Sequence, residues 1–272
     1  MATLYLVATP IGHMRDITLR ALDILRTVPL IAAEDTRSAR KLLAHFEIKA
    51  PRITSYNEHN ARAKTPALLD ALAAGDVAVI SDAGMPGISD PGHDLVVAAV
   101  AAGHTVVPIP GASAVVAAVA ASGLPSRRFH YLGFLPRQSG PRRRALAAAA
   151  VSGDTLVVYE SPHRLRAALD DALAALGDRR IAVCRELTKL HEEIWRGTIA
   201  GAIDHFREPR GEFTLVIEGG AVSVAEPADE ETVAAFVARL RADGVTAKRG
   251  VAELVRRFSL SRRAAYAAWH RP

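Results

Sequence analysis

The chain has only one cysteine among its 272 residues, and aromatic side chains make up only 5% of it. A single cysteine cannot form an internal disulfide, so the fold must be stable without one. Cys184 lies in an apolar run at residues 181–184 that is typical of a buried strand, where cysteine packs as a small hydrophobic residue. The first ten residues also lack the basic segment and apolar core of a signal peptide. We therefore expect a protein of the reducing cytoplasm.

Metal-binding and hydrolase signatures are missing as well. No two of the ten histidines have the spacing His-x-x-x-His, one cysteine cannot make a Cys-x-x-Cys pair, and no Gly-Lys-Ser/Thr loop marks nucleotide triphosphate binding. The small-residue run at 111–115 lacks the final glycine of a hydrolase nucleophile elbow. These absences predict no metal cofactor and disfavour hydrolytic chemistry.

The sequence has one uncharged stretch of membrane-spanning length, residues 106–125. Prolines at 108, 110 and 125 and glycines at 111 and 123 interrupt it, and alanine lowers its hydrophobicity. These breaks predict a strand followed by a buried helix. We expect no membrane partner.

Apolar runs typical of strands alternate with helical patterns along most of the chain. The first half has expected strands at 4–8, 30–33, 77–81 and 105–109, and expected helices at 17–25, 38–46, 95–102 and 112–121. The second half has expected strands at 129–134, 155–159, 180–184 and 213–218, and expected helices around residue 146 and at 162–176. Such alternation predicts an α/β fold with parallel or mixed sheets flanked by helices.

We expect three domains. An N-terminal α/β domain at 1–122 and a C-terminal α/β domain at 123–225 meet near residues 122–126, and a small helical domain occupies 226–272. A charged, proline-containing hinge at 224–231 precedes a helix with apolar residues on one face, which Gly244 ends. A second helix at 246–257 and a turn at 259–261 lead to a basic, aromatic third helix. The pattern resembles a helix-turn-helix.

The formal net charge of +5 and the sequence pI of about 9.6 favour polyanionic partners. The basic residues cluster in the middle of the chain and in its C-terminal segment, where acids are scarce. We take these clusters as candidate RNA-binding positions, in particular Arg142, Arg143, Lys248, Arg249, Arg262 and Arg263.

In parallel α/β sheets, ligands bind beyond the carboxyl ends of the strands. Four loops follow expected strands, at 9–13, 81–92, 110–114 and 160–164. The loop at 81–92 is the most informative, because its three glycines let the backbone approach a ligand while Pro86 and Pro91 stiffen the path. Ordered loops of this length are usually functional, whereas the small-residue helix start at 111–114 is equally consistent with close packing.

Seven segments of the chain, in order, resemble motifs of the tetrapyrrole methylase superfamily, and in particular of its members that act on ribosomal RNA. They are Thr9-Pro10-Ile11-Gly12 with Asp16-Ile17-Thr18, the segment 33–37, the loop 82–92, Pro110-Gly111-Ala112-Ser113-Ala114, Gly133-Phe134-Leu135-Pro136, Glu160-Ser161-Pro162-His163-Arg164 and Arg185-Glu186-Leu187-Thr188-Lys189. One departure is His13, where the family pattern has asparagine.

The resemblance implies a two-domain α/β fold that binds S-adenosylmethionine between its domains, commonly as a homodimer. It implies 2'-O-methylation of a cytidine ribose in the decoding region of 16S rRNA, within the small ribosomal subunit. It also implies a set of cofactor-binding residues, namely Pro10, Gly12, Asp82, Gly84, Pro86, Ile88, Ser113, Ala114, Tyr159 and Glu160.

Methyl transfer from a sulfonium needs no metal and no acid for the leaving group, so positioning is the main contribution of the protein. A ribose hydroxyl is a poor nucleophile, however, and a base would help. We consider His163, in the first turn of a helix, and the pair Glu186 and Lys189 as candidate catalytic residues. Helix capping around His163 and an ordinary surface ion pair between Glu186 and Lys189 are the structural alternatives.

Arg37 and Arg164 are further candidates for contact with RNA. Asp35 or Thr36 is expected to cap a helix in whose first turn Arg37 lies, and Arg164 has the same position in a later helix. A cation at the positive end of a helix dipole is unfavourable, so capping does not explain either arginine. We therefore assign both to phosphate or ribose contacts.

Two other functions compete with this interpretation. A member of the superfamily that acts on a tetrapyrrole, a corrin or a protein side chain would account for the cofactor loops but not for the basic C-terminal segment. A non-catalytic RNA-binding module would use the helix-turn-helix but leave the loops of the first 220 residues without a role.

Overall fold

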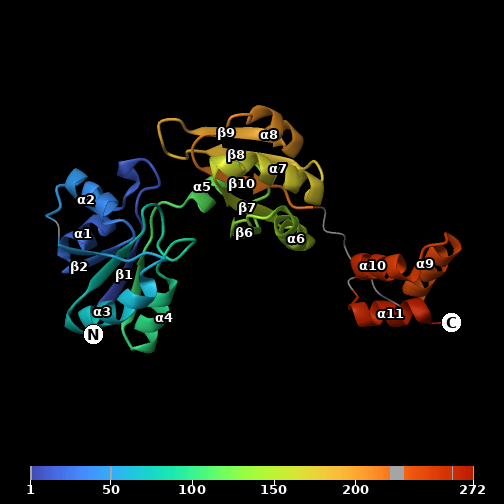
Figure 1. The fold of residues 1–272 in the computed structure, drawn as a ribbon, viewed down its shortest axis with the longest axis horizontal. Coiled ribbons are helices and arrows are strands. Elements are labelled where there is room, and N and C mark those ends of the chain that lie inside the picture. Colours follow the sequence, from blue (N-terminus) through green and yellow to red (C-terminus); the bar gives the residue numbers. More distant parts are fainter. Residues whose placement is uncertain (1, 50, 221–229, 259, 272) are drawn as a thin grey trace. The chain divides into compact units, whose positions relative to one another are not determined.

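The computed structural model describes residues 2–49, 51–220, 230–258 and 260–271. They form two compact units. The first unit holds two β-sheets, which we call the first and second lobes, and the second holds the C-terminal helices, which we call the helical unit (Figure 1). The α/β architecture predicted from the sequence is confirmed.

The first lobe is built on a five-stranded sheet in the order β3-β2-β4-β1-β5, and every pairing in it is parallel. Parallel strands buried on both faces are expected to be apolar throughout, and every residue of β2 and β4 is buried. Its strands are β1 (Thr3–Val7), β2 (Leu30–Ala33), β3 (Arg52–Ser55), β4 (Val77–Ile80) and β5 (Thr105–Ile109).

Helices cover both faces of this sheet. Apolar residues of α1 and α2 pack on one face, and those of α3 and α4 pack on the other (Figure 1). The helices of the first lobe are the short 3-10 helix η1 (Met14–Asp16), α1 (Leu19–Thr27), α2 (Thr36–His45), α3 (Ala61–Ala74) and α4 (His93–Ala101).

Strand β3 and helix α3 are not among the elements predicted from the sequence. β3 lies at the edge of the sheet, so none of its residues is fully buried and its sequence Arg-Ile-Thr-Ser has a single apolar residue. α3 contains Pro66, which the sequence rules treat as a helix breaker. Tertiary packing of Leu68 and Leu72 against the sheet outweighs that preference.

The second lobe has a mixed five-stranded sheet in the order β6-β7-β10-β8-β9, in which only β6 and β7 are parallel. Its strands are β6 (Phe129–Phe134), β7 (Thr155–Glu160), β8 (Arg180–Arg185), β9 (Glu193–Thr198) and β10 (Phe213–Ile217). Its helices are α6 (Ser139–Ala149), η2 (Ala150–Ser152), α7 (Pro162–Leu176) and α8 (Ile199–His205).

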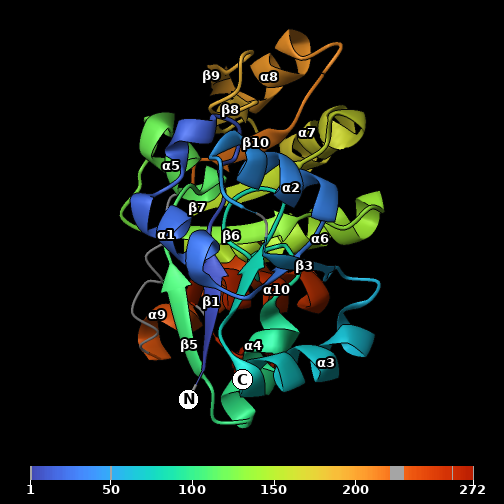
Figure 2. The same cartoon turned by 90° about the vertical axis from the view of Figure 1, so that its left-hand side faces the viewer.

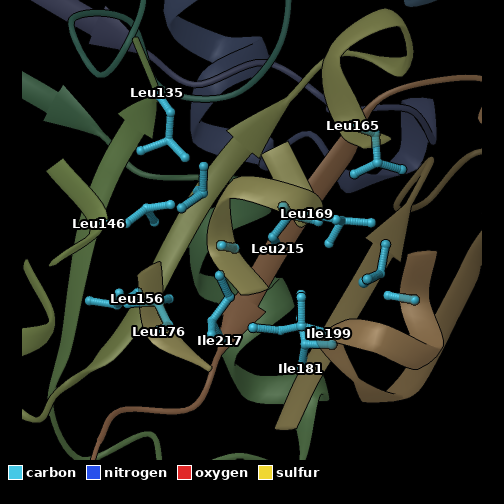
Figure 3. Packing of buried hydrophobic residues seen from close by; sticks show 14 of the residues in the cluster. Leu135, Leu146, Leu156, Leu165, Leu169, Leu176, Ile181, Ile199, Leu215 and Ile217 are labelled. Atoms are coloured by element: carbon cyan, nitrogen blue, oxygen red, sulfur yellow. The ribbon is translucent and has the colours of Figure 1, made fainter. Parts of the chain in front are cut away.

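One face of the second sheet packs against α6, α7 and α8 in a core of leucine and isoleucine (Figure 3). The other face is covered by α5 (Ala114–Ser122), whose Val115 and Val119 contact Val157, Val216 and buried Cys184. Figures 1 and 2 both show α5 against this sheet. α5 therefore packs on the second sheet, although it precedes the boundary expected near residues 122–126.

Strand β9 and helix α8 are also absent from the sequence prediction. β9 is an edge strand with no buried residue, and the sequence Glu-Ile-Trp-Arg-Gly-Thr does not alternate clearly between apolar and polar. Trp195 nevertheless packs against the core of the second lobe.

The helical unit consists of α9 (Glu230–Ala242), α10 (Ala247–Phe258) and α11 (Arg262–His270). Val233, Val237, Leu254 and Trp269 form the centre of its core, as the apolar face of the first helix predicts. Residues 224–229 of the expected hinge and Ser259 of the expected turn lie outside the described residues. Within the described residues, the structure has no helix that is long and apolar enough to cross a membrane.

Candidate active site

The carboxyl ends of β1, β2 and β4 open into a hollow of about 340 Å³. It includes four of the residues predicted to be functional, one of which comes from the second lobe. We call it the central hollow, and its predicted members are Pro10, Gly12, Asp82 and Lys189. The other predicted cofactor residues are not part of its wall: Gly84, Pro86, Ile88, Ser113, Ala114, Tyr159 and Glu160.

The loop after β4 is fixed to the loop after β1 by backbone hydrogen bonds. The Thr9 amide donates to the Gly84 carbonyl at 2.9 Å, and the Gly84 amide donates to the Thr9 carbonyl at 3.1 Å. Gly84 has a φ of +80°, which glycine adopts without a steric cost. The Thr9 hydroxyl also donates to the Ser81 carbonyl at 3.1 Å. These contacts hold Asp82 at the central hollow.

Gly12 is required by close packing between the lobes. A Cβ atom at Gly12 would lie 2.5 Å from Cγ of Lys189 and 2.7 Å from Oγ1 of Thr188. The adjacent His13 amide donates to Oγ1 of Thr188 at 3.0 Å, and Nδ1 of His13 accepts the Arg15 amide at 3.2 Å. This is the capping role that asparagine also performs, so the departure at position 13 leaves the turn intact.

A cluster of acids that form no salt bridge with the described residues lies at the carboxyl edge of the first sheet. Glu34 accepts the Asp82 amide at 3.2 Å, and the charges of Asp82 and Glu58 act on both Glu34 and Asp90. Burial raises the pKa of Glu34, and the nearby acids add to the effect. Burial, with the charges of Glu34, Asp82 and Glu58, also raises the pKa of Asp90 to about 7. Among the described residues, none of the four forms a salt bridge.

Arg37 has a local explanation that the sequence analysis did not find. Asp35 caps α2 by accepting the Arg37 amide at 2.7 Å, and the Arg37 guanidinium pairs with the same carboxylate at 2.6 Å. The Arg37 side chain donates to Asp35 and lowers the pKa of that carboxyl to about 2. The argument from the helix dipole therefore fails for Arg37, because the capping carboxylate neutralises it.

Arg164 is likewise held by a neighbouring carboxylate, at the end of β7. Its Nε lies 3.3 Å from Oε1 of Glu160, a fully buried carboxylate that also accepts the Ser161 amide at 2.9 Å. Burial raises the pKa of Glu160, and Ser161 and Arg164 only partly oppose it. Oε2 of Glu160 has no hydrogen-bond partner within the described part of the chain. His163 is exposed beside this pair.

The prediction that Arg142 lies at an RNA-binding surface is wrong. Its side chain is only 5% exposed, pairs with buried Asp171 at 2.6 Å, and donates to the Ala167 carbonyl at 3.3 Å. A guanidinium fixed in this way cannot reach a phosphate. Arg143 shares Asp171 but is half-exposed.

Glu186 and Lys189 form the ion pair that the sequence analysis considered as a structural alternative. Nζ of Lys189 lies 3.0 Å from Glu186 and 2.7 Å from Glu212. Burial disfavours both charges, but the pair and the Glu212 amide outweigh it, so the pKa of Glu186 is lowered and that of Lys189 is raised. Lys189 is thus a fixed cation at the central hollow, and a poor base.

Two tyrosines that the sequence analysis did not combine join the lobes. The hydroxyls of Tyr131 and Ser89 lie 2.7 Å apart, which links β6 to the loop after β4. The ring of Tyr159 stacks edge-on against Tyr131 and Phe134 at 5.2 and 5.6 Å. Burial raises the pKa of both tyrosines, so they are hydrogen-bond donors rather than bases at neutral pH.

The chain belongs to the family described as Tetrapyrrole (Corrin/Porphyrin) Methylases, which matches residues 3–203. It is a methyltransferase. A Halalkalibacterium halodurans protein named "Ribosomal RNA small subunit methyltransferase I" is 49% identical over 82% of this chain and 78% of its own length. Proteins of the same name from Synechocystis sp. and Bacillus subtilis are 47% and 42% identical, and the alignments cover 98% and 99% of this chain and 96% and 94% of theirs.

Solved structures of lower identity share the fold. Diphthine synthase matches with a TM-score of 0.62 and 15% identity, covering 80% of this chain and 90% of its own. Uroporphyrin-III C-methyltransferase from Thermus thermophilus, complexed with S-adenyl homocysteine, matches with a TM-score of 0.58 and 21% identity, covering 81% and 98%.

Proposed function

We propose that the chain transfers a methyl group from S-adenosylmethionine to the 2'-hydroxyl of a cytidine ribose in 16S rRNA. The observation that carries this proposal is the identity of 41–49% with proteins named for methylation of small-subunit ribosomal RNA. Several of these relatives align over 98% or more of this chain, so the likeness includes the helical unit. We propose that the chain acts in the cytoplasm, on the small ribosomal subunit.

The residues at the central hollow fit a cationic cofactor. Glu34 and Asp82 place negative charge there without a salt bridge among the described residues, and burial, followed by the charges of nearby acids, raises the pKa of Glu34. A sulfonium carries one positive charge and would balance it. When bound, S-adenosylmethionine supplies an electrophilic methyl group, and no metal is required.

We propose that the remaining cofactor contacts come from the loops predicted by the family resemblance. The backbone at Pro10, Gly12 and Gly84 would form the floor. The other proposed contacts are Pro86, Ile88, Ser113, Ala114, Tyr159 and Glu160.

The chain would accelerate the reaction chiefly by orienting the ribose for in-line attack. Of the three candidate bases, Lys189 holds its proton because its pKa is raised, and Glu186 is a weak base because its pKa is lowered, so we assign His163 to accept the hydroxyl proton. Lys189, as a fixed cation at the central hollow, is suited to hold an RNA phosphate there.

We propose that the helical unit supplies the main electrostatic contact with RNA. Lys248 and Arg249 lie exposed at the start of α10, and Arg262 and Arg263 lie exposed in the first turn of α11. Cations at helix N-termini are locally unfavourable, so a phosphate that binds them relieves that cost. Arg37, Arg143 and Arg164 remain proposed contacts of the first unit.

We also propose a homodimer. Val97 and Val100 share one face of α4 and are 54% and 60% exposed, and Val116 of α5 is 61% exposed. Exposed apolar side chains in helices of a small protein favour burial in an interface. Sedimentation at micromolar concentration tests this assembly.

The function is tested with labelled S-adenosylmethionine and small subunits from a strain that lacks the modification. We expect one label per subunit, at a cytidine whose 3' phosphodiester resists alkaline cleavage because its 2'-hydroxyl is methylated. Naked 16S rRNA serves as a second substrate and shows whether the assembled subunit is required. Label on protein, or on a base rather than a ribose, would overturn the proposal.

A further inference from the structure

A second hollow of about 230 Å³ lies at the end of β3, beside the loop that follows β4. We call it the side hollow, and its wall includes Tyr56, Glu58, Asp90, Gly92 and His93. It shares no lining residue with the central hollow. The two are nevertheless electrostatically linked, because the charges of Glu34 and Asp82 at the central hollow act on Asp90.

Tyr56 presents a polar group with no partner. The residue is only 1% exposed, and its amide donates to the Ala33 carbonyl at 2.8 Å, which fixes it to the sheet. Its buried hydroxyl has no hydrogen-bond partner among the described residues. A buried hydroxyl without a partner is costly, and its place in the wall of a hollow indicates that a ligand completes it.

Glu58 is held in an ordered turn beside this hydroxyl. The Asn57 amide donates to Oδ1 of Asn60 at 2.9 Å, and the Asn60 amide donates to Oδ1 of Asn57 at 3.2 Å. The His59 amide also donates to Oδ1 of Asn57 at 3.2 Å. Such reciprocal bonds fix the backbone of Glu58 without using its own carboxylate, which is left available to accept a hydrogen bond.

Asp90 adds a carboxyl group that can both donate and accept hydrogen bonds. Its surroundings are the acids Glu34, Glu58 and Asp82, with the Ser81 hydroxyl as a hydrogen-bond donor, and His93 and Asp94 also line the side hollow. With a pKa of about 7, its carboxyl is substantially protonated at neutral pH. A protonated carboxyl offers one donor and one acceptor side by side.

We propose that the side hollow receives the base of the target nucleotide and that Tyr56, Glu58 and Asp90 read the Watson–Crick edge of a cytosine. The Tyr56 hydroxyl donates to O2, the Asp90 carboxyl donates to N3, and the Glu58 carboxylate accepts from the N4 amino group. This inference rests on the proposed ribose methylation, because it places the base in the side hollow while the ribose faces the cofactor in the central hollow.

In this arrangement Glu58 disfavours uracil. Uracil has a carbonyl oxygen at position 4 and an N–H at position 3, where cytosine has an amino group and a bare nitrogen. A carboxylate only accepts hydrogen bonds, so Glu58 opposed to O4 leaves two acceptors facing each other. Tyr56 contacts an oxygen that both bases have, and contributes to binding without discriminating.

The first test replaces Tyr56 by phenylalanine and measures kcat/KM on small subunits that lack the modification. Removing an unpartnered buried hydroxyl should leave the melting temperature unchanged or raise it, yet lower kcat/KM by about 3- to 10-fold. Tyr5→Phe, the same change in β1 away from the side hollow, is the control. A Tyr56→Phe enzyme with unchanged kcat/KM would overturn the inference.

The second test exchanges the mapped target cytidine for uridine in reconstituted subunits. The unaltered enzyme should prefer cytidine, and Glu58→Gln should reduce this preference by at least about 10-fold, because the glutamine amide can donate to O4. Glu47→Gln, an exposed acid that lines neither hollow, is the control. An equal preference in Glu58→Gln and in the unaltered enzyme would overturn the inference while leaving ribose methylation in place. If the unaltered enzyme does not methylate the subunit at all, the proposed function fails first and the inference fails with it.

Discussion

The two lobes differ in how several of their carboxylates are partnered, although Asp35 of the first lobe also pairs with an arginine. In the second lobe, carboxylates have cationic partners: Arg142 and Arg143 with Asp171, Arg164 with Glu160, and Lys189 with Glu186 and Glu212. At the carboxyl edge of the first sheet, Glu34, Glu58, Asp82 and Asp90 have no salt bridge within the described ranges.

The pKa values of four acids record this contrast, whereas burial raises the pKa of Glu160 in the second lobe and Arg37 lowers that of Asp35 in the first. Hydrogen bonds and ion pairs lower the pKa of Asp171 and Glu186 even though burial opposes them, whereas burial raises that of Glu34 and Asp90 more than the hydrogen bonds from the Asp82 amide and Ser81 lower it. Negative charge that a fold leaves unbalanced is destabilising unless a ligand balances it. The second lobe thus uses these charges for structure, and the role that we propose for the acids of the first lobe is to bind a cation and hydrogen-bond donors.

We expect the largest loss of stability when a substitution breaks the buried ion pair of the second lobe. Arg142→Ala leaves Asp171 buried beside the half-exposed Arg143 alone, and we expect the free energy of unfolding to fall by about 3–5 kcal/mol. Arg143→Ala removes a half-exposed partner of the same carboxylate and should cost less than about 1 kcal/mol. Denaturant unfolding of both variants makes the comparison. An equal loss of unfolding free energy in the two variants would show that the burial of Arg142 does not strengthen its contribution to stability.

The next largest effect is expected on cofactor affinity, when one of these acids of the first lobe is replaced. Asp82→Ala should weaken binding of S-adenosylmethionine by about 10- to 100-fold, because a hydrogen bond or ion pair to a charged ligand is lost, while the melting temperature stays near that of the unaltered chain. Calorimetric titration measures the affinity. Asp70→Ala, at an exposed position of α3, is the matched control. Unchanged affinity in Asp82→Ala would remove the loop after β4 from the cofactor site.

The rule that ligands bind at the carboxyl ends of parallel strands was sufficient to predict part of the central hollow. It selected Pro10, Gly12 and Asp82, which follow strongly apolar strands. It did not select Tyr56, because β3 is a half-exposed edge strand that the pattern of apolar residues does not reveal. Glu34 and Asp90 were within the recognised motifs, but only the fold shows that their charges meet.

The pairing of the arginines could not be predicted from the sequence. Arg142, Arg143 and Arg144 are consecutive in α6, and only packing against α7 decides that Arg142 turns inward to Asp171. The argument for Arg37 failed for a related reason. It compared the guanidinium with the helix dipole alone, whereas the capping carboxylate of Asp35 is the nearer and stronger charge.

In the helical unit, the exposed charges proposed to bind a ligand are positive. Replacing Lys248, Arg249, Arg262 and Arg263 by glutamine should reduce the slope of log affinity for RNA against log salt by about 0.7–0.9 for each cation that contacts a phosphate. Cofactor binding should be unaffected. Filter binding at several salt concentrations measures the slope, and Arg207→Gln with Arg210→Gln, two exposed cations of the second lobe, is the control. An unaltered slope would mean that these four cations do not bind RNA.

The smallest effect concerns pH and has opposite signs in the two lobes. The pKa of Asp90 rises from its ordinary value of 3.8 to about 7 on folding, so between these values the folded chain binds a proton that the unfolded chain has released. Stability from this group therefore falls as pH rises from about 4 to about 7, whereas Glu186, whose pKa is lowered, loses its contribution as pH falls below about 4. We expect the melting temperature to fall by about 2–4 °C between pH 5 and pH 8, with Asp90 partly screened by solvent.

Asp90→Asn should flatten this dependence of the melting temperature on pH because an amide does not titrate, and Glu186→Gln should leave it unchanged. A slope that persists in full in Asp90→Asn would mean that the unbalanced charge of the first lobe is located elsewhere.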